Sequence, residues 1–157
     1  MERINYREYP DGLMQAMRTV QTYIDKSGLD HLLLDLMRVR VSQINGCVYC
    51  LDMHFKEAVH AGEDPLRLIS LPAWREAPYY SPVERAVLAF AERLTRMPEG
   101  DDGEGLHDEL LLHFTKQEIA LLSVAVAQIN SWNRLMKSFN PEAGNYVVGS
   151  KGKDPEA

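Results

Sequence analysis

Apolar residues recur at helical spacing along most of this chain. In the first such segment, about Gly12 to Lys26, they lie three or four residues apart, which is the spacing of one face of an α-helix. A second segment, about Leu29 to Ile44, is apolar on more than one face and predicts a helix buried on several sides. The same criterion predicts further helices at about Cys47 to His60, Pro65 to Ser70, the Ser81 cap to Arg96, Leu106 to His113 and Lys116 to Ser138.

Short polar motifs mark where several of these helices begin and end. Ser81 with Glu84 and Thr115 with Glu118 have the spacing of capping boxes, in which each side chain binds the other residue's backbone N–H. Asn45-Gly46 ends the second helix, because both residues tolerate the left-handed backbone of a helix end. These signals agree with the helical periodicity on either side of them.

The pattern as a whole predicts an all-α fold. No segment shows convincing alternation of polar and apolar residues, as a half-buried strand would. The 157 residues are enough for one domain with a sizeable core. We therefore expect a compact multi-helix bundle over residues 1–140, followed by a loosely ordered tail, residues 141–157.

Charge and hydropathy narrow the function classes. The formal net charge is -6 and Lys and Arg do not gather in one run, so there is no electrostatic footprint for nucleic acid. No apolar stretch is long enough to span a bilayer, and the first twenty residues lack the apolar core of a secretory signal. We expect a cytoplasmic protein.

The candidate chemistry lies at the start of the third helix. Cys47 and Cys50, the chain's two cysteines, share a helical stripe with His54. The positive end of the helix dipole favours a thiolate and lowers a cysteine pKa. His54 could take the proton of Cys50 or stabilise its thiolate. Asp35 lies among apolar neighbours, where an unpaired carboxylate would be unfavourable, so His54 is its expected partner.

Other interpretations of the same residues stay open. The cysteines could be two small buried hydrophobes, His54 a hydrogen-bonded core histidine and Asp35 a solvated residue. A zinc site is a further alternative, with Cys47, Cys50 and His54 as ligands and His60 or His31 as a fourth. Tight structural zinc sites usually bring a second close ligand pair, and none is visible in the sequence.

The stretch Leu36 to His54 resembles the core of the alkyl hydroperoxidase D-like branch of the carboxymuconolactone decarboxylase superfamily, whose pattern is E-x11-C-x2-C-x3-H. Residues 74–86 resemble the family's next segment, and Asn130 to Arg134 its late helix. The resemblance covers roughly residues 30 to 140. Two positions depart from the pattern: Asp35 stands where the family has glutamate, and Tyr49 stands where the type member has a histidine.

The resemblance implies an all-α homo-oligomer, a trimer or hexamer, without a bound cofactor. It implies that Cys50 attacks the peroxide and that Cys47 resolves the sulfenic acid into a disulfide. His54 and the motif carboxylate, here Asp35, would form a proton relay. The disulfide would then be reduced by a dithiol partner, which in the type system is a lipoylated protein.

The leading functional hypothesis is therefore a thiol-dependent hydroperoxide reductase, an antioxidant disulfide oxidoreductase. One alternative is a lyase of the decarboxylase branch that acts on a small lactone acid, although such members need no cysteine pair. The other is a non-catalytic helical oligomer whose cysteines report redox state or are inert.

Overall fold

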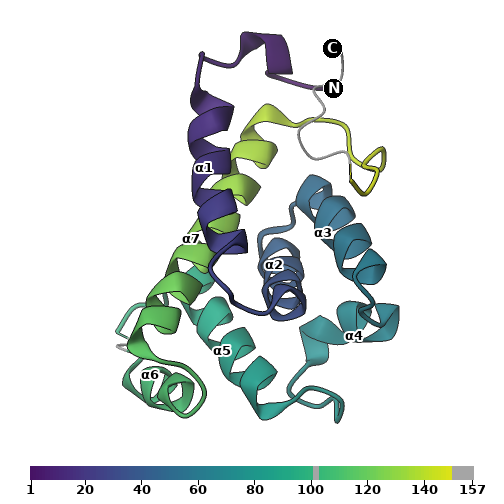
Figure 1. The fold of residues 1–157 in the computed structure, drawn as a ribbon. Coiled ribbons are helices and arrows are strands. Elements are labelled where there is room, and N and C mark those ends of the chain that lie inside the picture. Colours follow the sequence, from purple (N-terminus) through teal and green to yellow (C-terminus); the bar gives the residue numbers. More distant parts are fainter. Residues whose placement is uncertain (101–102, 150–157) are drawn as a thin grey trace.

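The computed structural model describes residues 1–100 and 103–149 of the chain. This part folds into seven α-helices and two single-turn 3-10 helices and contains no strand, which confirms the all-α prediction (Figure 1). In chain order the elements are η1 (Tyr6–Glu8), α1 (Leu13–Asp25), α2 (His31–Asn45), α3 (Val48–His60), α4 (Pro65–Ser70), η2 (Leu71–Ala73), α5 (Pro82–Arg96), α6 (Glu104–Leu111) and α7 (Lys116–Phe139). None of the described helices is long and apolar enough to cross a membrane.

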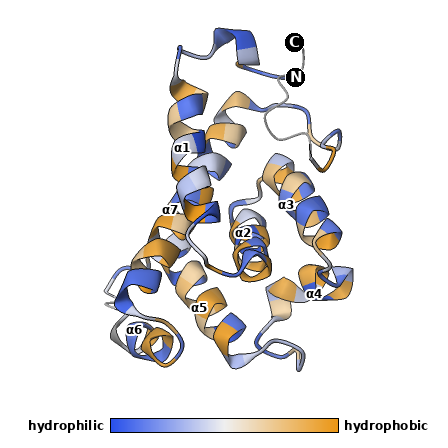
Figure 2. Ribbon diagram, in the orientation of Figure 1, coloured by the Kyte–Doolittle hydropathy of each residue, from blue (hydrophilic) through white to orange (hydrophobic). Residues whose placement is uncertain are grey.

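Helix α2 is the centre of the fold. Ten successive residues, 33–42, are buried, because α3, α5 and α7 pack around it (Figure 1). The predicted burial on several sides is therefore confirmed. The surrounding helices carry both hydrophobic and hydrophilic residues, as expected for helices with one face on the core and one toward solvent (Figure 2).

Most helix boundaries follow the predicted signals. Helices α4 and α5 have the predicted bounds, and Ser81 and Thr115 each form the predicted capping box. Helix α6 starts and ends two residues earlier than expected, so its first turn begins inside the acidic connector, residues 98–105. Residues 101–102 of that connector lie outside the described part. The sequence analysis missed η1, whose three residues are too few for a periodic pattern and which Asn5 caps.

Buried charge joins α2 to α5. The carboxylate of Glu92 accepts hydrogen bonds from Arg40 Nε at 2.7 Å, Trp74 Nε1 at 3.0 Å and Arg75 Nη1 at 2.8 Å. Arg96, one turn along α5, lies 3.3 Å away. Glu92 and Arg40 are both buried, so this cluster satisfies charges that would otherwise be unfavourable in the interior.

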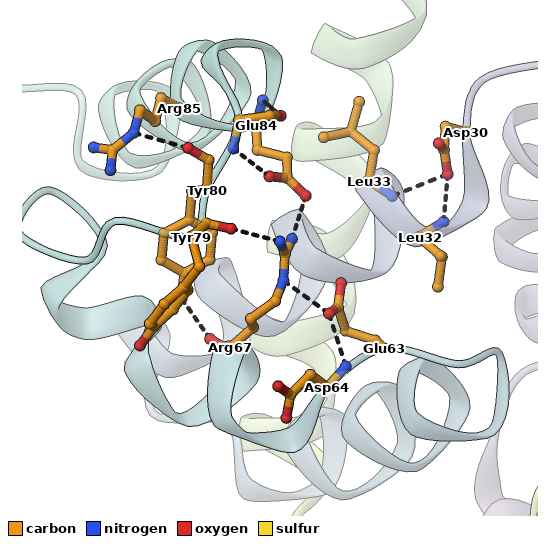
Figure 3. A network of polar contacts seen from close by, with 11 residues as sticks. Asp30, Leu32, Leu33, Glu63, Asp64, Arg67, Tyr79, Tyr80, Glu84 and Arg85 are labelled. Carbon is orange, nitrogen blue, oxygen red and sulfur yellow. Dashed lines mark hydrogen bonds and ion pairs between the residues drawn. The ribbon is translucent and has the colours of Figure 1, made fainter.

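A cavity of about 540 Å³ lies where the first turns of α2, α4 and α5 meet. Figure 3 shows that its polar groups are bound to one another: Asp30 accepts from the backbone of α2, and Arg67 pairs with both Glu63 and Glu84. Asp64 caps α4 in the same way. The carboxylates that line the cavity therefore hold helix ends together. Neither cysteine lines this cavity.

The two ends of the described chain pack on the same side of the molecule (Figure 1). Arg3 N and Ile4 N both donate to Phe139 O, at 2.8 and 3.3 Å. Beyond α7, Gly144 N and Tyr146 N donate to Asp52 on α3, at 3.1 and 3.2 Å. Of the tail for which loose order was predicted, residues 150–157 lie outside the described part, so that prediction is not tested there.

Candidate active site

The turn between α2 and α3 places both cysteines at a helix start. Gly46 has a left-handed backbone, with φ of 61°, and Cys47 N donates to Ser42 O at 3.0 Å. This arrangement closes α2 and reverses the chain. Cys47 then becomes the N-cap of α3, and its sulfur accepts from Cys50 N at 3.4 Å. The predicted helix break at Asn45-Gly46 is thus confirmed.

The two thiols are in direct contact and inaccessible. Their Sγ atoms lie 2.7 Å apart, and both cysteines are free. The exposed fraction is 2% for Cys47 and 1% for Cys50. Apolar side chains from three parts of the chain surround them: Ile4, Tyr9, Leu13, Tyr49, Trp132, Leu135, Met136 and Phe139. The two sulfurs are therefore separated from solvent by a mostly apolar covering.

The surroundings shift the pKa values of the two thiols in opposite directions. The pKa of Cys47 is lowered to about 7, chiefly by a hydrogen bond from the Cys50 thiol and against the opposing effect of burial. The Cys50 backbone N–H, the charge of Lys137 and the side chain of Asn133 contribute to the same lowering of the Cys47 pKa. The same hydrogen bond, together with burial, raises the pKa of Cys50. Sequence reasoning expected the helix start to favour a thiolate at Cys50. In the structure the pKa is lowered at Cys47 and raised at Cys50, chiefly because of the hydrogen bond between the two thiols.

Asp35 on α2 and His54 on α3 lie close to one another. The distance from His54 Nδ1 to Asp35 Oδ1 is 4.0 Å, beyond hydrogen-bond length but within ion-pair range for a protonated imidazole. The same carboxylate oxygen lies 3.3 Å from Arg38 Nη1. Sequence reasoning named His54 as the partner that explains a buried Asp35; the closer partner is Arg38.

Arg38 was missed, although its position could have indicated it. It lies three residues after Asp35 on α2, a spacing at which two side chains meet on one helix face. Its other nitrogen, Nη2, donates to Asp25 of α1 at 2.7 Å. Because Arg38 is buried, it needs both carboxylates. The charge of Asp35 therefore helps to hold Arg38, which binds Asp25 of α1, and it also lies near His54.

A network of side-chain amides was also missed. Asn45 Nδ2 donates to Asn130 Oδ1 at 2.9 Å and to Asn133 Oδ1 at 2.8 Å. Asn133 Nδ2 donates to Ser42 Oγ at 3.0 Å. The detectable signal is polar residues three apart in an otherwise apolar helix. Sequence reasoning named Asn130 and Asn133 only within the segment that resembles the family's late helix.

The zinc alternative requires a cluster of ligand side chains. Among residues 1–100 and 103–149, no group of three or more His, Cys, Asp or Glu side chains is arranged to hold a metal ion. The described residues therefore give no support to a zinc site formed by Cys47, Cys50 and His54.

Known proteins resemble this chain in sequence and in fold. The model of the Carboxymuconolactone decarboxylase family matches residues 11–93. The uncharacterized protein YdfG of Bacillus subtilis is 34% identical over 134 residues, which span 85% of this chain and 91% of that protein.

Two solved structures share the arrangement of helices. One is a protein of unknown function from Agrobacterium tumefaciens, named as a candidate antioxidant defence protein AhpD. It has a TM-score of 0.87 and 34% identity, and the match covers 93% of this chain and 100% of that one. The other, an uncharacterized peroxidase-related protein from Silicibacter sp. TM1040, has a TM-score of 0.77 and 23% identity, with 90% and 75% covered. Together with the cysteine motif, these matches show that the chain belongs to the carboxymuconolactone decarboxylase family, in its alkyl hydroperoxidase D-like branch.

Proposed function

We propose that this protein is a thiol-dependent hydroperoxide reductase that cycles between a Cys47/Cys50 dithiol and a disulfide. The observation that carries the proposal is the contact of two reduced sulfurs, 2.7 Å apart, at the start of α3. Two thiols in this position can form a disulfide with little movement of the fold. Family membership and the antioxidant and peroxidase-related names of the two solved relatives support the same class of activity.

Cys50 is the proposed attacking sulfur, as the family motif implies. The two sulfurs share a hydrogen bond, and Cys50 S–H is the donor when Cys47 is a thiolate. Transfer of that proton to Cys47 leaves a thiolate on Cys50. This thiolate attacks the terminal oxygen of a hydroperoxide. An S–O bond forms while the O–O bond breaks, and the departing alkoxide takes up the displaced proton and leaves as an alcohol.

Cys47 then acts as the resolving sulfur. Its low pKa returns it to the thiolate once the proton has left, and it attacks the Cys50 sulfenic acid. The S–S bond forms, the S–O bond breaks, and hydroxide leaves as water after taking a proton. His54, one turn along α3, is the proposed proton carrier, with Asp35 held 4.0 Å from its imidazole.

A second dithiol must return the enzyme to its reduced state. A thiolate of the donor attacks one sulfur of the Cys47–Cys50 disulfide, and its second thiol completes the exchange, so two electrons pass from donor to enzyme. We propose a small dithiol or a lipoylated protein as the donor. Assembly into a trimer or hexamer is part of the same proposal, and light scattering of the purified protein measures it.

The test is a peroxide-reduction assay with a panel of alkyl hydroperoxides and dithiol donors. We expect dithiol-dependent peroxide consumption by the unaltered protein, loss of more than about a hundredfold in Cys50→Ser, and accumulation of sulfenic acid in Cys47→Ser, trapped by a dimedone reagent. Full activity in Cys50→Ser would overturn the assignment of the attacking sulfur. Turnover of a lactone acid that survives alkylation of both thiols would indicate the decarboxylase alternative. Unreactive thiols would indicate the non-catalytic one.

A further inference from the structure

Helix α7 directs a row of polar side chains at the turn that holds the cysteines. Asn130, Asn133 and Lys137 lie three and four residues apart, which places them on one helix face. Asn130 and Asn133 both accept from Asn45 Nδ2, and Lys137 Nζ donates to Asn45 O at 3.1 Å. Asn133 has an exposed fraction of 0%, so its amide is a buried polar group whose hydrogen bonds matter for the site.

The orientation of the Asn133 amide is determined by its neighbours. Its oxygen accepts from Asn45, and its nitrogen donates to the Ser42 hydroxyl. Ser42 is also the residue whose carbonyl accepts from Cys47 N. One residue of α2 thus binds both Asn133 and the backbone of Cys47. Because the amide carries two N–H groups and the Ser42 hydroxyl accepts from one, the other has no acceptor among the described residues and lies beside the turn that holds the sulfurs.

We propose that Asn133 is a further catalytic residue of the thiol site: its second N–H donates a hydrogen bond to the anionic sulfur of the Cys47–Cys50 pair. Asn45 and Ser42 are positioning residues that hold the amide in this orientation. The inference rests on the proposed function, since it concerns the same two thiols. In agreement with it, Asn133 is among the causes that lower the pKa of Cys47, and it opposes the larger effects that raise the pKa of Cys50.

A neutral donor suits this chemistry better than a close cation would. The two sulfurs are almost fully buried, and a thiolate without hydrogen bonds would be strongly disfavoured there. During attack on a peroxide the negative charge leaves the sulfur for the departing oxygen. A neutral amide stabilises the thiolate less strongly than a cation in a fixed ion pair would, so it opposes the transfer of charge away from sulfur less. The groups that act electrostatically on the same pair are Lys137 on α7 and Tyr49 on α3.

The chain offers a matched control in Asn130. It accepts from the same Asn45 nitrogen, but its own amide donates to Thr95 Oγ1 at 2.9 Å and Val126 O at 2.9 Å. Asn130→Ala therefore disturbs the network as Asn133→Ala does, without removing a donor to sulfur. Asn133→Asp is the second test variant: it keeps an oxygen for Asn45 and replaces the N–H donors by a negative charge.

The experiment titrates the thiolate of the reduced proteins by absorbance at 240 nm, which does not depend on access of a reagent. We expect the lower thiol pKa, about 7 in the unaltered protein, to rise by about one unit in Asn133→Ala, as loss of a charge-assisted hydrogen bond implies. It should rise further in Asn133→Asp and by less than about 0.3 unit in Asn130→Ala. In guanidinium chloride all variants should titrate alike.

The outcomes separate this inference from the proposed function. An unchanged pKa in both Asn133 variants, or an equal rise in Asn130→Ala, would overturn the role of Asn133. Should Asn133→Ala not fold, as judged by circular dichroism, Asn133→Asp decides the question. A titration that depends on Asn133 in a protein that reduces no hydroperoxide would retain the donor role and reject the peroxidase.

Discussion

At the scale of single residues, the properties of Cys47 and Asp35 depend on the few groups that contact each side chain. The pKa of Cys47 is low chiefly because the Cys50 thiol donates to its sulfur. Its place as the N-cap of α3, where it also accepts from Cys50 N, adds to the effect. Asp35 is divided between Arg38 at 3.3 Å and His54 at 4.0 Å. Its side chain is one methylene shorter than the glutamate of the motif that the sequence resembles, and we expect this difference to contribute to the 4.0 Å between Asp35 Oδ1 and His54 Nδ1.

Replacement of Asp35 by glutamate tests this explanation. The extra methylene adds roughly 1.5 Å of reach, which is enough to close the gap to His54. We expect Asp35→Glu to raise kcat/KM for hydroperoxide reduction severalfold, because a hydrogen-bonded imidazole is a better-oriented base. Asp25→Glu is the control, since Asp25 is the other carboxylate on Arg38. Equal or lower activity in a folded Asp35→Glu protein would show that the proton relay does not limit the reaction.

The pKa of the cysteines provides a second test at this scale. The largest cause of the low pKa of Cys47 is the hydrogen bond from the Cys50 thiol. Cys50→Ala removes that donor, so we expect the Cys47 thiolate to form at a higher pH, with its 240 nm midpoint moved from about 7 toward the ordinary 9.0. Val48→Ala, a change at an exposed neighbour, should leave the midpoint in place. A midpoint near 7 in Cys50→Ala would assign the low pKa to the helix start instead.

At the scale of elements, the turn from α2 to α3 matters most for the site. Gly46 closes α2 with a left-handed backbone, and the next residue caps α3. Only Gly46 and Cys47 separate α2 from α3, which leaves little freedom in where the cysteines lie. Helix α7 fixes the same turn from outside through Lys137, whose Nζ is 3.1 Å from Asn45 O.

Gly46→Ala should therefore destabilise the protein. A residue with a Cβ is disfavoured at φ of 61°, and the new atom would lie 3.7 Å from Lys137 Nζ, so strain rather than collision is expected. We expect the free energy of unfolding to fall by about 1 kcal/mol, measured by urea denaturation. Gly105→Ala is the matched control, because Gly105 lies in α6 with nothing within 4 Å of an added Cβ. It should stabilise by about 0.5–1 kcal/mol, and a loss at both positions would contradict the argument.

At the scale of the whole molecule, buried charge holds the helices around α2. Glu92 on α5 binds Arg40 of α2 and also Trp74 and Arg75 beyond η2. Burial by itself would raise the pKa of Glu92, but the hydrogen bonds from Arg75, Trp74 and Arg40 together lower it below its ordinary 4.5. The carboxylate is thus charged in the folded protein and connects three segments that are far apart in the sequence.

Glu92→Gln should destabilise the protein by about 3 kcal/mol at pH 7, because it leaves the buried Arg40 without its counter-charge. Since the folded pKa is depressed, the stabilisation is fully present above pH 4.5 and is lost as the pH falls through the folded value. The difference between Glu92→Gln and the unaltered protein should therefore shrink below pH 4.5. Urea denaturation at pH 7 and at lower pH measures it, with the exposed Glu109→Gln as control. A difference that stays constant with pH would refute the charged state of Glu92.

The amino-acid sequence by itself determined the helices and the identity of the reactive groups. Periodicity and capping boxes are local, so the bounds of α4 and α5 and the break at Asn45-Gly46 could be predicted before any fold was known. The close spacing of Cys47, Cys50 and His54 is local in the same sense.

The tertiary structure alone decided which groups act on the thiols. Asn133 and Lys137 are more than eighty residues from the cysteines in sequence, and they meet them because α7 packs on α2 and α3. The pairing of Arg38 with Asp25 likewise depends on where the fold places α1 relative to α2, whereas its pairing with Asp35 is local to α2. A pKa responds to hydrogen bonds, burial and charges within a few ångströms, and those neighbours are set by packing between helices. For that reason the sequence could name both cysteines but could not say which of them carries the resting charge.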